Sequence, residues 1–213
     1  WEQPGYPVLE ALFETGKLFM IEPAEAFRRM SLTGSLGRPI AYAIIFGWLG
    51  IIAQQLYQLA LGGSWMRWLP NMPQSEELAA SSLWSTGMSL GMMVLAPLLV
   101  IIGLFIGAAI VHLFLLLVGG ANSGFDATVR VMCYASTVQV LQVVPMCGGA
   151  AAGISALVLE VIGLAIAHRT TQGKAVAAVL LPVALCCACI AVLVVAFGAA
   201  IFAAIAGAAA HAR

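Results

Sequence analysis

Long uncharged stretches dominate the pattern of hydrophobic and polar positions along this chain. No Asp, Glu, Lys or Arg occurs in four of them, residues 39–66, 78–125, 131–159 and 175–212. Each stretch can hold the run of about 20 apolar residues that a membrane-spanning helix needs. The runs are continuously apolar, as in IIGLFIGAAIVHLFLLLVGG, whereas a membrane-spanning strand alternates polar and apolar residues. The pattern therefore predicts an all-α, polytopic membrane protein rather than an outer-membrane barrel.

The apolar stretches divide into five predicted transmembrane helices, at about residues 39–61, 88–118, 127–146, 149–168 and 175–206. Together they form a predicted membrane domain over residues 39–213. The second and fifth helices are longer than the bilayer requires, so we expect them to tilt, kink or project from it. Pro97 and Pro182 are the expected kink sites, because proline removes a backbone donor and clashes with the preceding helical turn.

Residues 1–38 form a separate predicted segment, amphipathic and either cytoplasmic or interfacial. Within residues 8–30, apolar side chains recur at roughly helical spacing with glutamates between them. One interpretation places this segment flat in the membrane interface, with Arg28 and Arg29 reaching lipid headgroups. The alternative is that it caps the helix bundle on the cytoplasmic side. No signal peptide is recognisable, and because the chain begins with Trp1 rather than Met we expect further residues upstream.

Composition supports a membrane location, and charge placement predicts an orientation. The chain is 62% hydrophobic and 8% charged, against about 25% charged in an ordinary soluble domain. With a cytoplasmic N-terminus, the inside segments hold seven of the nine Lys and Arg residues, so the positive-inside rule predicts N-in and C-out. The first external loop carries Trp65 and Trp68, which we expect to anchor at the water–lipid boundary. The alternative is that they line an external mouth for a ligand.

The cysteines and histidines do not form a recognisable metal or catalytic motif. Cys186, Cys187 and Cys189 lie in an apolar run without a nearby histidine or carboxylate, so we expect them to pack as small apolar residues. The histidines fall at different predicted depths, and no zinc-protease or phosphate-loop motif occurs. We therefore expect no metal, no cofactor and no enzymatic activity.

Four polar side chains fall in one slab of the predicted bilayer, near its cytoplasmic face. At about 1.5 Å rise per residue, Glu160 is about 12 Å deep, His112 about 9 Å and Arg130 about 5 Å, with Tyr134 one turn deeper than Arg130. A charge in the hydrocarbon costs at least about 2.5–3.5 kcal/mol, so Glu160 is expected to pair with Arg130 while Tyr134 or His112 completes the network. This intramembrane polar cluster is either a structural clasp or a ligand site.

Several segments together resemble the bacterial branch of the Yip family, the Ypt/Rab-interacting integral membrane proteins. They are EPAEAFRRM, GSLGRPIAYAIIFG, GGANSGFDATVRVMCYAS, PMCGG, GLAIAHRTTQGKA and AVLLP, at residues 22–30, 34–47, 119–136, 145–149, 163–175 and 178–182. The resemblance implies a compact five-helix domain with a cytoplasmic N-terminus, in the bacterial inner membrane. Eukaryotic relatives act in vesicle traffic, partly through Rab-type GTPases, and carry Tyr-Gly and Asp-Leu-Tyr signatures. This chain has only Gly5-Tyr6, in reverse order, and no Asp-Leu-Tyr, which argues against GTPase binding.

These observations favour a non-enzymatic membrane organiser, adaptor or subunit of a membrane complex. Its expected partners are the lipid bilayer and either a second copy or another membrane protein, and we expect no nucleic acid. The alternative is a small-solute or ion permease that uses Glu160. A polar cavity reaching Glu160 would favour the permease, whereas a dry bundle with an exposed face of small residues would favour the interaction protein.

Overall fold

The chain is helical throughout the part that the structure describes. A computed structural model describes residues 7–61 and 76–211, and no strand occurs in these two ranges. The elements are α1 (Val8–Ile21), α2 (Pro23–Arg29), α3 (Gly37–Leu61), α4 (Glu76–Leu117), α5 (Gly124–Ala135), the 3-10 helix η2 (Ser136–Val143), α6 (Gly148–Ala167) and α7 (Gln172–His211). The all-α prediction is confirmed.

Four of the described helices are long and apolar enough to cross a membrane. They are Gly37–Tyr57, Thr86–Leu117, Gly148–Ala167 and Gln172–Gly198. These ranges correspond to the first, second, fourth and fifth predicted spans. The match follows from the long apolar runs, in which charged side chains are rare.

The third predicted span, residues 127–146, is not one continuous helix. Its first part belongs to α5, and the rest forms the 3-10 helix η2. The change of helix type has a local cause, because the Ser136 hydroxyl donates to the Cys133 carbonyl at 2.6 Å and the Thr137 hydroxyl to the Tyr134 carbonyl at 2.7 Å. Such bonds from a side chain to the preceding turn compete with the backbone ladder of an α-helix. A five-span count therefore stays a prediction.

Helix α5 is the centre of the bundle rather than an outer span. Every residue from 127 to 135 is buried except Met132, which is half-buried. Helices α3, α4 and α6 all contact α5. A helix buried on all sides has no face to present to lipid, which explains how it can carry threonine, tyrosine and arginine side chains.

Helices α1 and α2 pack across one side of this bundle. Helix α1 buries Ala11, Gly16 and Phe19, while an apolar stripe formed by Leu9, Phe13 and Met20 is exposed. Helix α2 inserts Phe27 against Gly163 of α6, where an added Cβ would lie 2.7 Å from the ring. The segment thus caps the bundle, and its location in a membrane interface stays a prediction.

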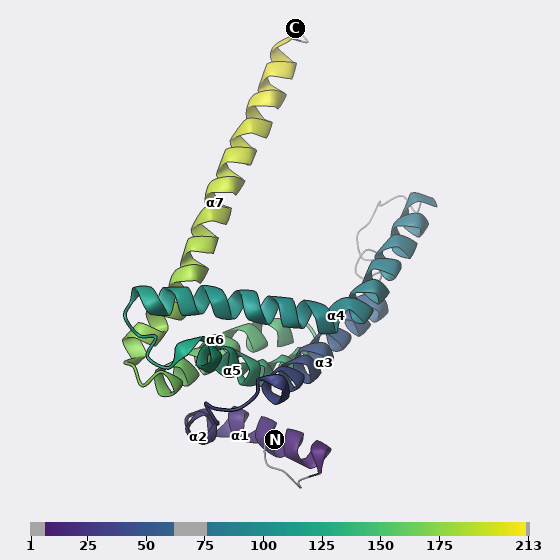
Figure 1. The fold of residues 1–213 in the computed structure, drawn as a ribbon. Coiled ribbons are helices and arrows are strands. Elements are labelled where there is room, and N and C mark those ends of the chain that lie inside the picture. The colour runs from purple at the N-terminus through teal and green to yellow at the C-terminus, as the bar shows by residue number, and fades with distance from the viewer. Residues whose placement is uncertain (1–6, 62–75, 212–213) are drawn as a thin grey trace.

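Two long helices extend beyond the packed core. Helix α4, which contains Pro97, bends along its length, and α7 leaves the bundle so that its C-terminal end stands apart from the other helices (Figure 1). In α7 the buried residues are Ala175, Ala178 and Val179, after which residues 180–198 are exposed except for half-buried Pro182. The core therefore lies around α5, and α1 to α4, α6 and the first turns of α7 all contribute buried side chains to it.

Candidate functional site

Arg130 does not pair with Glu160 in this structure. Its side chain, 1% exposed, donates through Nη2 to the carbonyls of Gly34 at 2.6 Å and Ser35 at 3.1 Å. Arg130 thereby fixes the loop between α2 and α3 against α5. The predicted ion pair is wrong here, because a shared depth does not place two side chains on facing sides of their helices.

Tyr134 belongs to an aromatic group formed with side chains of α1 and α3. Its ring stacks on Phe19 of α1, with centroids 5.0 Å apart and an interplanar angle of 10°, and lies 5.0 Å from the Tyr42 ring. The Tyr42 hydroxyl is 2.7 Å from the Thr137 hydroxyl. This group joins α1, α3 and α5 at the centre of the core.

His112 is part of a hydrogen-bonded chain at the junction of α4, α5 and α6. Its Nδ1 lies 2.8 Å from the Thr128 hydroxyl, which lies 2.9 Å from Nε2 of His168. Thr128 and His168 are fully buried. Two loop residues complete the chain, since the Ser123 backbone N–H donates to His168 Nδ1 at 3.2 Å and Asn122 Nδ2 to the His168 carbonyl at 3.0 Å.

The direction of these bonds fixes the protonation of His168. A backbone N–H can only donate, so His168 Nδ1 must carry a lone pair and the neutral ring has its hydrogen on Nε2. His168 Nε2–H therefore donates to Thr128, whose own hydrogen can point to His112 Nδ1. The chain is a neutral, buried clasp between three helices. No substrate atom can reach the Thr128 hydroxyl in this structure, because the residue has no exposed surface.

Glu160 lies in α6 between two cavities of about 320 Å³ each. The first lies between α4, α6 and α7, with mainly apolar walls that include Ile110, Leu157 and Val183. The second is bounded by α3, α4, α5, η2 and α6, and its lining contains Ser136, Gln139 and Gln142. Among the described residues, the Glu160 carboxylate makes no hydrogen bond or ion pair.

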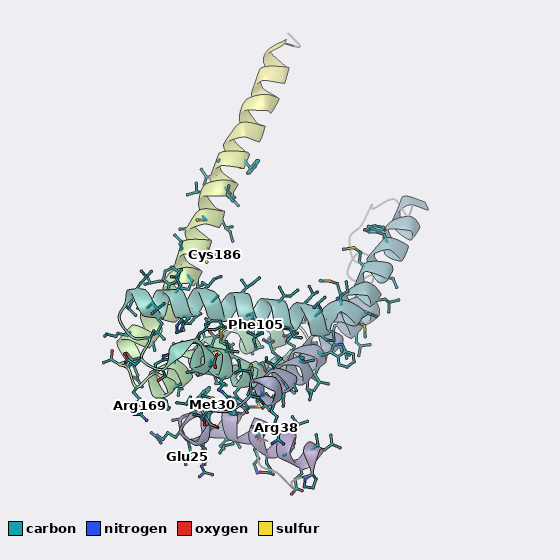
Figure 2. All side chains as sticks on the ribbon, viewed as in Figure 1. Glu25, Met30, Arg38, Phe105, Arg169 and Cys186 are labelled. Carbon is teal, nitrogen blue, oxygen red and sulfur yellow. The ribbon has the colours of Figure 1, made fainter. Side chains whose placement is uncertain are left out.

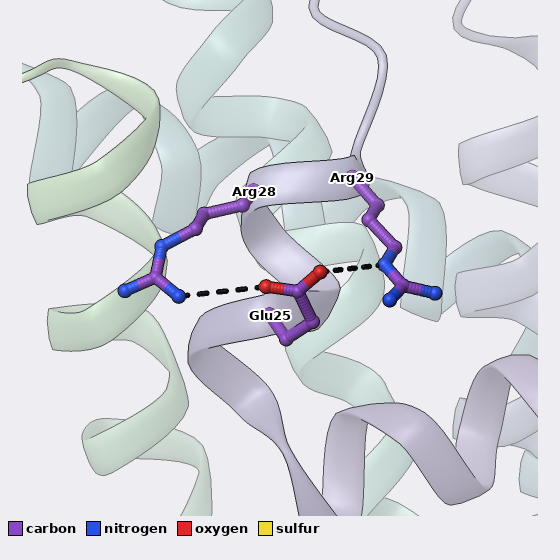
Figure 3. Close-up of polar contacts among 3 residues, drawn as sticks. All are labelled: Glu25, Arg28 and Arg29. Carbon is purple, nitrogen blue, oxygen red and sulfur yellow. Dashed lines mark hydrogen bonds and ion pairs between the residues drawn. The ribbon is translucent and has the colours of Figure 1, made fainter.

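Of the residues predicted to anchor the protein at the membrane surface, the structure describes the two arginines but not the two tryptophans. Arg28 Nη1 lies 3.4 Å from one carboxylate oxygen of Glu25, and Arg29 Nε lies 2.7 Å from the other (Figure 3). The hydrogen bond and then the charge of Arg29 lower the pKa of Glu25. Both arginine side chains are about two-thirds exposed, so their anchoring role stays a prediction. Trp65, Trp68 and the Gly5-Tyr6 pair lie outside the described residues.

The cysteines of α7 are exposed in the single chain rather than packed in its core. Cys186, Cys187 and Cys189 are all exposed, and the first two line the apolar cavity beside Glu160. Within residues 7–61 and 76–211 no group of three metal-ligating side chains occurs. Cys133 is the buried cysteine of the described set, in the central helix α5.

Sequence reasoning missed Thr128 and His168, the two buried members of the clasp. A signal for both was present, because His112, Thr128 and His168 all stand at the predicted cytoplasmic ends of apolar helices. In the sequence, His168 marks the end of the fourth predicted span, and a single threonine near the start of a helix is too common to indicate a hydrogen-bonded site. The polar loop residues Asn122 and Ser123 were the further indication that this junction is hydrogen-bonded.

Comparison with known proteins identifies the family. The Yip1 domain family model matches residues 17–194, which is most of the 213-residue chain. No curated protein and no solved structure matches it. The matched range contains all of α2 to α6 and α7 as far as residue 194. With four helices able to span a bilayer, the chain is a multi-pass membrane protein, and it belongs to the Yip1 domain family.

Proposed function

We propose that this protein is a non-enzymatic organiser or adaptor subunit of a membrane complex, with α7 as the helix that binds its partner. The observation that carries the proposal is the exposure of α7 after its first turns. Its apolar side chains are open on all sides, for example Val192 at 67% and Val195 at 71% exposed. The partner is either a second copy or another membrane protein.

The exposed length of α7 also has the composition of a helix–helix interface. Ala184, Ala188, Ala191 and Gly198 recur at spacings of four, three and seven residues, which places them on one face of the helix. Small residues let two backbones approach closely in a membrane, where van der Waals packing rather than the hydrophobic effect drives association. A partner helix on this face would bury surface that the other helices of the chain leave open.

The polar ends of the fold support an orientation for this complex. Figure 2 places Glu25, Arg38 and Arg169 on the side occupied by α1 and α2, and Cys186 on α7 beyond the opposite side. We propose that the charged side is cytoplasmic, in agreement with the count of Lys and Arg, and that α7 runs outward through a bacterial inner membrane. The α1–α2 cap is then the surface available to cytoplasmic proteins.

The test compares two substitutions of equal bulk on α7. We expect Ala188→Ile, on the face of small residues, to dissociate the complex that the wild type forms in mild detergent. Cys189→Ile, on another face, should leave the complex intact. Mass measurement by light scattering, with identification of any second protein, gives the stoichiometry. A wild-type protein that elutes as a lone monomer, or two variants that behave alike, would contradict the proposal.

A second candidate function is a small-solute or ion permease, favoured by the cavity with polar side chains in its lining that reaches Glu160 from the α3 side. Its lining includes Ser136, Gln139 and Gln142, and polar groups within a bilayer often mark a substrate path. Reconstituted vesicles that accumulate a solute in a Glu160-dependent manner would support it. The organiser predicts no such flux.

A further inference from the structure

Glu160 is an acidic side chain within a predicted membrane helix, and among the described residues its carboxyl group makes no hydrogen bond or ion pair. Arg130 donates to loop carbonyls, and Lys174 Nζ donates to the Gly119 carbonyl at 2.8 Å. These two cations are therefore engaged with backbone carbonyls rather than with Glu160. An acidic side chain within a membrane helix normally faces a partner or a cavity. Glu160 lines two cavities.

The two cavities that meet at Glu160 differ in chemistry. The cavity beside α7 is walled mainly by aliphatic side chains, among them Ile110, Val179 and Val183. The cavity beside α3 contains the Ser136 hydroxyl and the amides of Gln139 and Gln142, and the two amides are hydrogen-bonded to each other. The rest of the lining beside α3 is apolar, for example Ile51, Leu99 and Met132. One carboxylate thus stands between an apolar chamber and a chamber of mixed lining, which we call the polar chamber for its three polar side chains.

We infer that Glu160 anchors a binding site for an amphiphilic ammonium compound, a primary amine that carries an aliphatic chain. The ammonium group would pair with the Glu160 carboxylate and use its remaining hydrogens on oxygen acceptors of the polar chamber. The aliphatic chain would fill the apolar chamber beside α7. The inference goes beyond both functions proposed above and requires neither of them.

Other ligand classes fit this arrangement less well. Magnesium and calcium need about six to eight oxygen ligands, whereas the linings of the two cavities contain one carboxylate. An anion would be repelled by the same carboxylate. A neutral apolar molecule would fill the chamber but leave the charge without a counterion, and only an ammonium group balances the charge while supplying three hydrogen-bond donors. Each chamber is at the lower end of the about 300–1,000 Å³ range of ligand pockets.

The amine can come from two sources, a lipid headgroup or a free amphiphilic amine. A phosphatidylethanolamine molecule could enter from the bilayer through the open side of the apolar chamber, where Cys186 and Cys187 on α7 form part of the wall. A free long-chain amine would use the same carboxylate and the same aliphatic surface. The shared chemistry is a primary ammonium group next to an alkyl chain.

The experiment measures binding of dodecylamine to the purified full chain in maltoside micelles, through the shift in thermal unfolding followed by tryptophan fluorescence. The expected result is a stabilising shift with dodecylamine that dodecanol, of the same chain length, does not produce. Glu160→Gln keeps the shape of the side chain and removes its charge, so it should weaken dodecylamine binding about tenfold or more. Glu25→Gln, which removes an exposed carboxylate outside the site, should bind like the wild type.

The source is assigned by native mass spectrometry after incubation with mixed phosphatidylethanolamine and phosphatidylglycerol. Retention of phosphatidylethanolamine by the wild type but not by Glu160→Gln identifies a lipid ligand. Glu160-dependent dodecylamine binding without lipid retention identifies a free amine. The inference is overturned if wild type and Glu160→Gln bind dodecylamine equally, or if dodecanol binds as well as dodecylamine. Glu160→Gln should fold, because it removes an unbalanced charge, and its own melting curve checks this.

Discussion

The contact between α2 and α6 has no room for a single methyl group. A Cβ on Gly163 would lie 2.6 Å from Val131 Cγ1 and 2.7 Å from two ring atoms of Phe27. Neither neighbour can easily move away, because Val131 is fully buried and Phe27 is 2% exposed. The Phe27 ring also packs edge-on against Phe19, with centroids 4.8 Å apart. Gly163→Ala should therefore push α2 off the bundle.

The magnitude decides which assay can see this change. Overpacking of a buried contact costs about 1–3 kcal/mol, while replacing a helical glycine by alanine gains about 1 kcal/mol of helix stability. These effects partly cancel in global unfolding. In the local release of α2 the gain in helix stability drops out, because α6 stays helical in both states, and the overlap with Phe27 is relieved while the overlap with Val131 of α5 remains. A cost of about 1–3 kcal/mol raises the released population about 5- to 150-fold.

Limited trypsin digestion measures the released population through cleavage after Arg28 or Arg29, which requires α2 to unfold locally. Gly163→Ala should be cleaved there faster by that factor. Gly153→Ala is the matched control, because it makes the same change in the same helix where nothing lies within 4 Å of the added Cβ. Phe27→Leu combined with Gly163→Ala should restore part of the protection in a double-mutant cycle. Equal cleavage of the two alanine variants would refute the reasoning.

Two further predictions concern hydrogen-bonded groups. Thr128→Val removes the hydroxyl that lies between His112 and His168, so it should destabilise the protein by about 1–3 kcal/mol in thermal unfolding. Thr128→Ser keeps a hydroxyl and should recover most of this stability. Equal destabilisation in both variants would refute the clasp. The pKa of Glu25 is lowered by Arg29, so its contribution to α2 is present above the ordinary carboxyl range and is lost as pH falls through the lowered pKa. Hydrogen-exchange protection factors of α2 should therefore fall in acid, and Glu25→Gln should remove this pH dependence; a wild-type profile in that variant would contradict it.

The fold class and four spans could be predicted because their signal is long in sequence. An uncharged stretch of about 20 residues constrains a helix whatever its neighbours are. The α5–η2 region could not be predicted in this way, because its structure depends on two hydroxyls, Ser136 and Thr137, that bond to carbonyls one turn earlier. In a search for apolar stretches, one serine and one threonine barely lower the hydrophobicity of the segment. Their effect on the backbone appears only when the side chains are placed.

The candidate site was predicted by depth, and depth is one coordinate of three. The helical rise assigns each polar side chain a depth, but each residue also turns about 100° around the helix axis. Thr128 and Arg130 are two residues apart and so face nearly opposite directions, one toward His112 and the other toward Gly34. The direction of a side chain relative to a neighbouring helix depends on packing, which the sequence pattern of one helix does not contain.

The predicted pairing of Arg130 with Glu160 does not occur, because Arg130 finds other hydrogen-bond acceptors. A guanidinium group carries five N–H donors and needs oxygen acceptors near it. These acceptors can be backbone carbonyls and need not belong to a carboxylate. Backbone carbonyls at Gly34 and Ser35 supply two of them, and a loop reaches Arg130 more readily than a side chain fixed in the middle of α6. A carboxylate needs donors, and the described side chains around Glu160 supply none that bond to it. The same requirement for hydrogen bonds therefore engages Nη2 of Arg130 within the chain and directs Glu160 toward a hydrogen-bond donor from outside it, which a bound ammonium group would provide.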